Sequence, residues 1–227
     1  MKILAVDAAT EACSVALYND GEINSVFEVC PQQHSQKLLP FIDQVLVDSG
    51  LTLSQLDGIA YGQGPGSFTG VRIGVSVTQG LAFGADLPVS GVSNLAMMAQ
   101  QAIEQHQAQS VVAAIDARMS EIYLACYQNM NGLAQLLDNE IVIKPELLQK
   151  DDFQIQNSMS VGTGWGTYNE QLSTCFNATS SIIELPDAKF MLALALDAFN
   201  KGAGVAAELA QPNYVRDEVS WKKLPGR

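Results

Sequence analysis

Short apolar runs alternate with helical patterns along this chain, and their order predicts a mixed α/β fold. Segments with apolar runs or strand-like alternation are expected to be strands: 3–7, 12–18, 22–29, 58–61, 88–92, 110–116, 121–128, 133–142 and 158–161. Longer segments with apolar residues at helical spacing are expected to be helices: 34–48, 67–83, 93–105 and 186 to about 201. A polar tail over residues 211–227 ends the chain.

The two halves of the chain begin alike, which predicts two related lobes. Each half opens with an apolar strand that ends in an aspartate, Asp7 or Asp116, and then continues into a β-hairpin. We therefore expect an N-terminal lobe over residues 1–106 and a C-terminal lobe over residues 107–227. The second lobe is expected to be an eroded copy that also carries the C-terminal helix and the tail.

A glycine-rich loop precedes the helix predicted at 67–83. Gly62 and Gly66 permit positive φ and close backbone approach, and Ser67 or Thr69 can cap the first helical turn. Such a loop can hold an anion at the helix N-terminus, or it can be a tight turn without a ligand. No Gly-Lys-Ser/Thr sequence follows, so the loop is not a P-loop. The further glycines of this helix indicate close packing against another helix.

The charge of the chain argues against direct nucleic-acid binding. Acidic residues outnumber basic ones 24 to 12, which gives a formal net charge of −12. Because RNA affinity depends on cationic contacts to phosphate, any role in RNA chemistry is expected to depend on a basic partner. The alternative is that the acidity serves solubility alone. The first apolar run is too short for a signal peptide, and the widely spaced cysteines are expected to be buried thiols in a reducing cytoplasm.

Several motifs spread over nearly the whole chain are specific in combination. They are Ile-Leu-Ala-Val-Asp-Ala-Ala-Thr at 3–10, His-Ser-Gln-Lys-Leu-Leu-Pro at 34–40, Gly-Gln-Gly-Pro-Gly-Ser-Phe-Thr-Gly at 62–70, Asp-Ala-Arg at 116–118, Glu-Ile-Tyr at 121–123, Gly-Thr-Gly-Trp at 162–165 and Pro-Asn-Tyr-Val-Arg at 212–216. Together they resemble the bacterial TsaB (YeaZ) family. The resemblance implies the actin-like ATPase (ASKHA) superfamily fold, with two ribonuclease-H-like lobes whose mixed sheets are flanked by helices.

Members of this superfamily hold nucleotide phosphates with two hairpins of the form Asp-x-Gly-Thr/Ser, one in each lobe. Here Asp7 and Thr10 fit the first hairpin, but Ala9 stands where the glycine belongs. In the second hairpin Asp116 is followed by the bulky Arg118. Both departures crowd a phosphate, so Asp7, Thr10 and Asp116 are candidate nucleotide residues of degenerate hairpins. A structural role for Asp7 in its turn is the favoured alternative.

The resemblance does not extend to the catalytic residues of the paralogue TsaD. That protein holds a metal with two histidines on one helix, and the matching positions here are Asn94 and Met98, neither of which replaces imidazole well. The only histidines are His34 and His106, which are far apart in the chain. Ser67 lacks a nucleophile elbow. Asp7, Asp116 and Glu121 could form a carboxylate cluster of the nuclease type, but the net charge of −12 and the lack of a basic substrate groove argue against it. We therefore expect no metal and no catalytic residues.

The helices at 34–48 and 67–83 carry more apolar surface than a helix covered on one side requires. We interpret this excess as a surface on which the same two helices of another subunit pack, forming a four-helix interface. The alternative is that both helices pack only against their own sheet. The residues assigned to the interface are His34, Leu38, Phe41, Ile42, Val45, Phe68, Val71, Gly74, Val75 and Thr78.

The resemblance implies a function in tRNA modification. It implies a non-catalytic subunit that docks and activates the catalytic paralogue TsaD and, with it, docks the ATPase TsaE. The complex transfers a threonylcarbamoyl group to N6 of the adenosine beside the anticodon in tRNAs that read codons beginning with adenine. We expect a homodimer when the chain is alone, only indirect contact with tRNA, no membrane association and a cytoplasmic location. No cofactor is expected to bind the chain tightly, although ATP or ADP could be bound in the complex. The alternatives are a stand-alone actin-like ATPase or small-molecule kinase, or a peptidase acting on TsaD.

Overall fold

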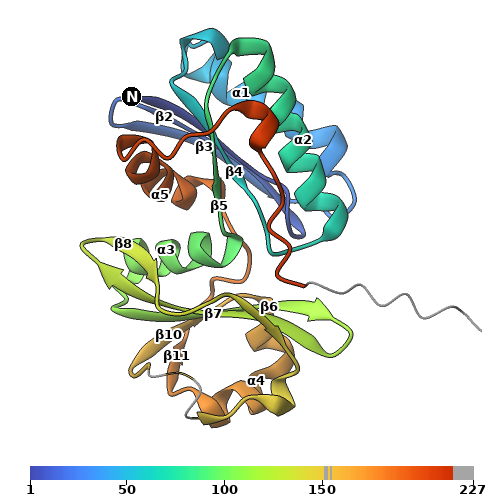
Figure 1. The fold of residues 1–227 in the computed structure, drawn as a ribbon, viewed down its shortest axis with the longest axis vertical. Coiled ribbons are helices and arrows are strands. Elements are labelled where there is room, and N and C mark those ends of the chain that lie inside the picture. The colour runs from blue at the N-terminus through green and yellow to red at the C-terminus, as the bar shows by residue number, and fades with distance from the viewer. Residues whose placement is uncertain (151–152, 154, 217–227) are drawn as a thin grey trace, which may run out of the picture.

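Two mixed β-sheets form the two lobes of the computed structural model, which describes residues 1–150, 153 and 155–216 (Figure 1). The first sheet has the order β3-β2-β1-β4-β5. Its strands are β1 (Lys2–Asp7), β2 (Ala12–Asn19), β3 (Glu22–Val29), β4 (Gly58–Gly62) and β5 (Val89–Val92). β2 is antiparallel to β1 and β3, whereas β4 is parallel to β1 and β5.

The second sheet repeats this strand order, β8-β7-β6-β10-β11, with β9 pairing on β7 beside β8. Its strands are β6 (Ser110–Arg118), β7 (Glu121–Met130), β8 (Leu133–Leu136), β9 (Ile141–Ile143), β10 (Ser158–Val161) and β11 (Ala178–Ser180). The strand predicted at 133–142 is therefore wrong as one element, because it is divided into β8 and β9. The sheet of the second lobe is complete rather than eroded, and the duplication of the fold is confirmed.

The helices cover both sheets and also separate them (Figure 1). They are α1 (His34–Asp48), α2 (Phe68–Ala85), α3 (Asn94–His106), α4 (Thr163–Cys175) and α5 (Ala188–Asn200). α1 and α2 lie side by side on the outer face of the first sheet, and α3 and α5 pack against each other between the sheets. Mixed sheets flanked by helices in two repeated lobes confirm the actin-like fold that the resemblance implied.

Alternation along β1 explains why its sheet needs helices on both faces. Leu4 and Val6 belong to the core beneath α1 and α2, whereas Ile3 and Ala5 belong to the core beneath α5. Chain order placed α5 with the second lobe, but α5 contacts β1 and β2 of the first sheet. α3, counted with the first lobe, instead covers β6 and β8 of the second. The two halves of the chain thus exchange helices, which joins the lobes through a shared core.

The strand and helix ends follow local sequence signals. Ser67 caps α2 by accepting a hydrogen bond from the Gly70 N–H, and Ser93 caps α3.

Three of the cysteines, Cys13, Cys30 and Cys126, are buried free thiols, and the fourth is half-buried. None of the helices in the described part of the chain has the length and apolarity needed to cross a bilayer.

Candidate functional site

Asp7, the last residue of β1, is fully buried rather than open to a nucleotide. Its Oδ1 accepts a hydrogen bond of 2.6 Å from Nδ2 of Asn94, and the Oδ1 of Asn94 in turn accepts one of 2.9 Å from the Gly64 N–H. Burial raises the pKa of Asp7 to about 7, although the Asn94 amide and the backbone N–H groups of Ala9 and Ala8 act to lower it. The carboxyl group therefore connects β1 to α3 directly and, through Asn94, to the glycine-rich loop.

The glycine-rich loop packs directly on the first hairpin. A Cβ at Gly62 would lie 2.0 Å from Oδ1 of Asp7, and a Cβ at Gly66 would lie 2.3 Å from the carbonyl oxygen of Ala9. The Ser67 N–H donates a hydrogen bond of 2.6 Å to that same carbonyl oxygen. These contacts favour the tight turn over the anion site, because the start of α2 and the turn of the first hairpin occupy each other's space.

The other residues of the first hairpin are also used within the fold. The side chain of Thr10 is buried, and its Oγ1 accepts a hydrogen bond of 3.5 Å from the Ala12 N–H. At Gly70 in the first turn of α2, a Cβ would lie 2.2 Å from the carbonyl oxygen of Ala8. This arrangement supports the structural role for Asp7 that the sequence favoured over nucleotide binding.

In the second hairpin, Arg118 contacts an acidic residue of each hairpin. Arg118 has a positive φ of 63°, and its N–H donates a hydrogen bond of 2.8 Å to Oδ1 of Asp116. Its guanidinium lies 3.6 Å from Oδ2 of Asp116 and 3.4 Å from Oε1 of Glu11 in the first hairpin. The two hairpins therefore face each other, as the fold requires, but the side chain of Arg118 bridges them. Sequence reasoning missed Glu11, which gave no motif signal.

The C-terminal segment, residues 211–216, spans the two lobes. The Asn213 N–H donates a hydrogen bond of 2.7 Å to the carbonyl oxygen of Gln63 in the first lobe. Arg216 donates to Oε2 of Glu121 and to the carbonyl oxygen of Ala117 in the second lobe. Glu121, considered for a carboxylate cluster, is thus paired with an arginine. In the described residues, no three His, Cys, Asp or Glu side chains are grouped in a way that could hold a metal ion.

The positions matched to metal ligands in the paralogue lie in the core. Asn94 is fully buried and bonded to Asp7, and Met98 is fully buried beside Gly162. His34, at the start of α1, is half-buried, and its Nε2 has no hydrogen-bond partner among the described residues. The Oγ of Ser67 accepts the capping hydrogen bond of α2. The described geometry therefore offers neither a histidine pair nor a base for this serine.

Most of the residues assigned to a subunit interface are not exposed, and this part of the prediction is wrong. They are buried against their own sheet or hairpin: Leu38, Phe41, Ile42, Val45, Val71, Gly74, Val75 and Thr78. Gly74 faces the first hairpin, because its Cβ would lie 3.9 Å from the backbone nitrogen of Ala8. The apolar stripes of α1 and α2 are wide because most of their residues pack against neighbouring elements of the same chain, while a few apolar residues are exposed. Of the assigned residues only Phe68 is exposed, and His34 is half-buried.

The outer face of α1 and α2 nevertheless carries large apolar side chains. The exposed fractions are 51% for Leu39, 67% for Val47, 57% for Phe68 and 79% for Phe83. On α2 this face also contains Gly80, at which an added Cβ would meet nothing within 4 Å. We call these five residues the helical surface.

One aromatic cluster fixes the C-terminal segment beside the helical surface. The guanidinium of Arg72 lies 3.3 Å from the ring centroid of Phe68, and its Nε donates a hydrogen bond of 2.9 Å to the Tyr214 hydroxyl.

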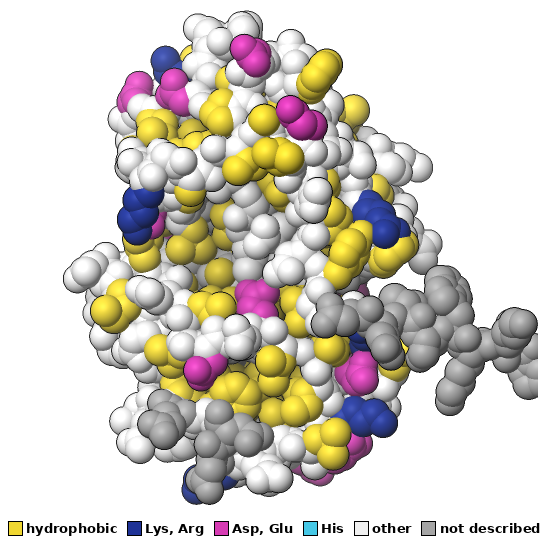
Figure 2. Space-filling view, viewed as in Figure 1, with side chains coloured by type: hydrophobic (Ala, Val, Ile, Leu, Met, Phe, Trp, Pro, Cys, Tyr) yellow, Lys and Arg dark blue, Asp and Glu magenta, His cyan; other side chains and the backbone are white. Residues whose placement is uncertain are grey.

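On the face drawn in Figure 2, lysine and arginine occur as separate side chains and not as a continuous basic patch. That face therefore has no feature expected of a phosphate-binding surface.

The family model, the relatives and the solved structure that match this chain carry the names TsaD, TsaB and YeaZ. The family model described as TsaD, tRNA N6-adenosine threonylcarbamoyltransferase, matches residues 26–223. The tRNA threonylcarbamoyladenosine biosynthesis protein TsaB of Escherichia coli K12 is 47% identical over the whole of both chains. TsaB of Haemophilus influenzae is 46% identical over all of this chain and 98% of its own. The solved structure of YeaZ from Pseudomonas aeruginosa superposes with a TM-score of 0.86 at 43% identity, covering 94% of this chain and 99% of that one.

Proposed function

This chain belongs to the TsaB family of tRNA threonylcarbamoyladenosine biosynthesis proteins, and from that membership we propose that it acts as a non-catalytic, activating subunit. It docks the catalytic paralogue TsaD, and TsaE joins through that complex. The transferred threonylcarbamoyl group is handled by TsaD, and this chain biases TsaD toward its active conformation by binding that conformation more tightly.

The packing of the first hairpin is the observation that carries this proposal. A nucleotide-binding hairpin must leave its backbone N–H groups open to phosphate. Here the Ala9 carbonyl accepts a hydrogen bond from the start of α2, and Asp7 is bonded to Asn94 inside the core. The bridge from Arg118 to Glu11 across the hairpins adds to the same argument. Because these hairpins are used for contacts within the fold, we infer that the chain binds a partner protein and does not carry out phosphate chemistry.

The helical surface is the docking site in this proposal. Large exposed apolar side chains on adjacent helices mark a protein interface. Glycine in the middle of a helix costs about 1 kcal/mol relative to alanine, yet no atom of the described residues lies within 4 Å of a Cβ added at position 80. A partner helix that approaches α2 closely explains it, because a side chain there would hold the two helices apart.

The same surface serves two associations. Alone, the chain forms a homodimer in which the helical surfaces of two copies meet around a two-fold axis. TsaD, with a similar pair of helices, competes for this surface and displaces the second copy. Contact with tRNA is indirect, because a net charge of −12 opposes binding to phosphate and requires a more basic partner.

Gly80→Leu tests the docking site. A Cβ added at this exposed position meets nothing within 4 Å among the described residues, so the variant should fold normally while the helix–helix approach is blocked. The matched control is Gly166→Leu, on α4 of the other lobe, where an added Cβ also meets nothing within 4 Å. Light scattering reports the homodimer, and co-purification with the cognate TsaD reports the complex.

We expect Gly80→Leu to be monomeric and to lose TsaD, whereas Gly166→Leu behaves as the wild-type protein. Unchanged dimerisation and unchanged TsaD binding in folded Gly80→Leu would place the interface elsewhere. Loss of only one association would refute the shared surface.

A further inference from the structure

β3 is the outermost strand of the first sheet, and the edge that faces away from β2 is open. A two-residue turn joins the two strands, so Asn19 and Glu22 form a hydrogen-bonded pair and every second residue of β3 bonds to β2. The hydrogen bond of 3.0 Å from the Cys30 N–H to the Glu11 carbonyl oxygen continues this alternation.

The remaining residues of β3 therefore direct their backbone N–H and C=O groups away from β2. They are Ile23, Ser25, Phe27 and Val29, and we call them the β3 edge. No segment in the described part of the chain pairs with these backbone groups, because β3 forms a ladder with β2 alone. Each such group can bond to a strand of another chain.

The side chains of the β3 edge are exposed as well. The exposed fractions are 47% for Ile23, 44% for Phe27 and 56% for Val29, and Ser25 is also exposed. Val26 packs on the core beneath α1 and α2, so these side chains lie on the opposite face of the sheet. Natural edge strands are usually protected by a charge, a proline or a bulge. The β3 edge has an uncharged, regular sequence with none of these.

A groove of about 200 Å³ borders the β3 edge at Phe27. Its other walls are Gln101 of α3 and the segment 182–187, which precedes α5. Ile182, with 91% of its surface exposed, and Leu185 add apolar surface to that of Phe27. The groove therefore extends the exposed apolar surface beyond the strand itself.

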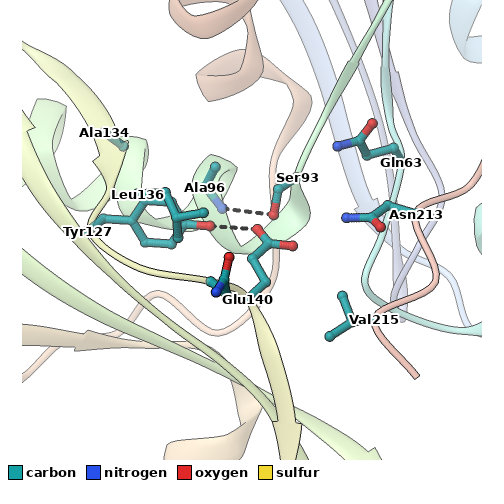
Figure 3. Close-up of a pocket in the computed structure, with 10 residues that line it drawn as sticks. Gln63, Ser93, Ala96, Tyr127, Ala134, Leu136, Glu140, Asn213 and Val215 are labelled. Atoms are coloured by element: carbon teal, nitrogen blue, oxygen red, sulfur yellow. Dashed lines mark hydrogen bonds between the residues drawn. The ribbon is translucent and has the colours of Figure 1, made fainter. Parts of the chain in front are cut away.

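Glu184 gives this groove an acidic rim. It is exposed and makes no hydrogen bond or ion pair with the described residues. By contrast, Glu140 in the larger cavity between the lobes already accepts a hydrogen bond of 2.7 Å from the Tyr127 hydroxyl (Figure 3). No lysine or arginine lines the groove in the described part of the chain. An unpaired carboxylate on a chain with a net charge of −12 favours a basic partner.

We propose that the β3 edge binds an extended segment of a partner protein in which lysine or arginine alternates with apolar residues. The segment adds a strand to the first sheet by bonding to the open backbone groups of β3. The methylene groups of one basic side chain lie against Phe27 and Leu185, and its charge lies beside Glu184. This site does not include the helical surface and does not depend on the proposed docking of TsaD.

Three peptides test the site on the full-length ¹⁵N-labelled protein. The first is Thr-Lys-Val-Lys-Val-Lys-Thr, the second has glutamate in place of lysine, and the third is the lysine peptide with methylated amide nitrogens at its five central residues. Amide chemical shifts and hydrogen exchange are measured. With the lysine peptide we expect saturable shifts centred on β3 and slower exchange of the four amide protons of the β3 edge. We expect binding at least about tenfold weaker for each of the other two peptides.

Variants separate strand pairing from charge. Ser25→Pro removes an N–H group that has no partner in the fold, and an edge position tolerates proline, so binding should fall at least about tenfold in a folded protein. Glu184→Gln should weaken the lysine peptide about threefold. Glu170→Gln, at an exposed position of α4, is the matched control and should leave binding unchanged. Gly80→Leu should also leave it unchanged, which separates this site from the helical surface.

Equal binding of the three peptides, shifts centred outside β3, or unchanged binding in folded Ser25→Pro would overturn the proposal. Slow exchange of the four edge amides in the protein alone, increasing with protein concentration, would also overturn it, because a second copy would then occupy the edge. The comparison of peptides uses the wild-type protein and stands even if Ser25→Pro fails to fold.

Discussion

The side chains of Asp7 and Asn94 meet across 2.6 Å, although 87 residues separate them in the chain. Asp7 ends the first strand of the first sheet, and Asn94 begins the helix that covers the second sheet. This hydrogen bond uses the aspartate that a nucleotide-binding relative would need for its metal. The same pair joins the two lobes, so this aspartate has a structural role that does not depend on phosphate chemistry.

The burial of Asp7 predicts a specific pH dependence of stability. The folded-state pKa is about 7, above the ordinary value of 3.8, so between these values the folded chain keeps a proton that the unfolded chain releases. Raising the pH through this interval therefore destabilises the fold through Asp7. We expect the unfolding free energy of the wild type, relative to Asp7→Asn, to fall by about 1.4 kcal/mol for each pH unit between pH 5 and pH 7.

Urea unfolding at several pH values measures this difference, which should level off above pH 7. Asp43→Asn, at an exposed position of α1, controls for the removal of one charge from an acidic protein. A difference between wild type and Asp7→Asn that stays constant with pH would show that the carboxyl group is ionised in the fold throughout.

The packing of α2 on the first hairpin and the bridge from Arg118 to Glu11 predict that the chain alone binds ATP-Mg weakly or not at all and does not hydrolyse it. Restoring glycine in the double variant with Ala9→Gly and Arg118→Gly should not recover binding. The reason is that the start of α2 still occupies the turn of the first hairpin, with Ser67 donating to the carbonyl at position 9. Isothermal titration calorimetry checks both proteins. A low-micromolar dissociation constant for the wild-type chain would favour the kinase or ATPase alternative.

The replacement of the paralogue's histidines predicts that the purified protein carries no stoichiometric iron or zinc. Asn94 is committed to Asp7, and Met98 is enclosed in the core, so neither is free to bind an ion. Elemental analysis of protein prepared without a histidine tag gives the measurement. One tightly held metal ion per chain would contradict this part of the account.

Most regular elements of the fold could be predicted from the sequence, because local signals determine them. The apolar run before Asp7 and the caps at Ser67 and Ser93 gave strands and helices close to those observed. The helix α4 and the strand β11 were not predicted. The start of α4, Gly162-Thr-Gly-Trp-Gly166, resembles a loop. The spacing of Trp165, Tyr168, Leu172 and Cys175 is helical and was the available signal.

What the sequence could not provide was the partner of each surface. A buried Leu38 and an exposed Leu39 are adjacent on one helix, and periodicity alone does not show which of them faces the sheet. The contact of Glu11 with Arg118 and the exchange of α3 and α5 between the sheets are long-range features without a local pattern. The assignment of the interface residues was wrong for this reason. An excess of apolar residues indicates that a helix is buried, but it does not show whether its own sheet or another subunit covers it.

The rate of tRNA threonylcarbamoylation in a reconstituted system tests the central proposal most directly. TsaD, TsaE and tRNA are assayed with the wild-type chain, with Asp116→Ala, with Gly80→Leu and without this chain, while gel filtration follows complex formation. We predict that Asp116→Ala supports nearly the wild-type rate wherever the complex forms, and that Gly80→Leu is as inactive as the omission of the chain. Loss of turnover in Asp116→Ala with an intact complex would contradict the account, because the chain would then supply a reacting group.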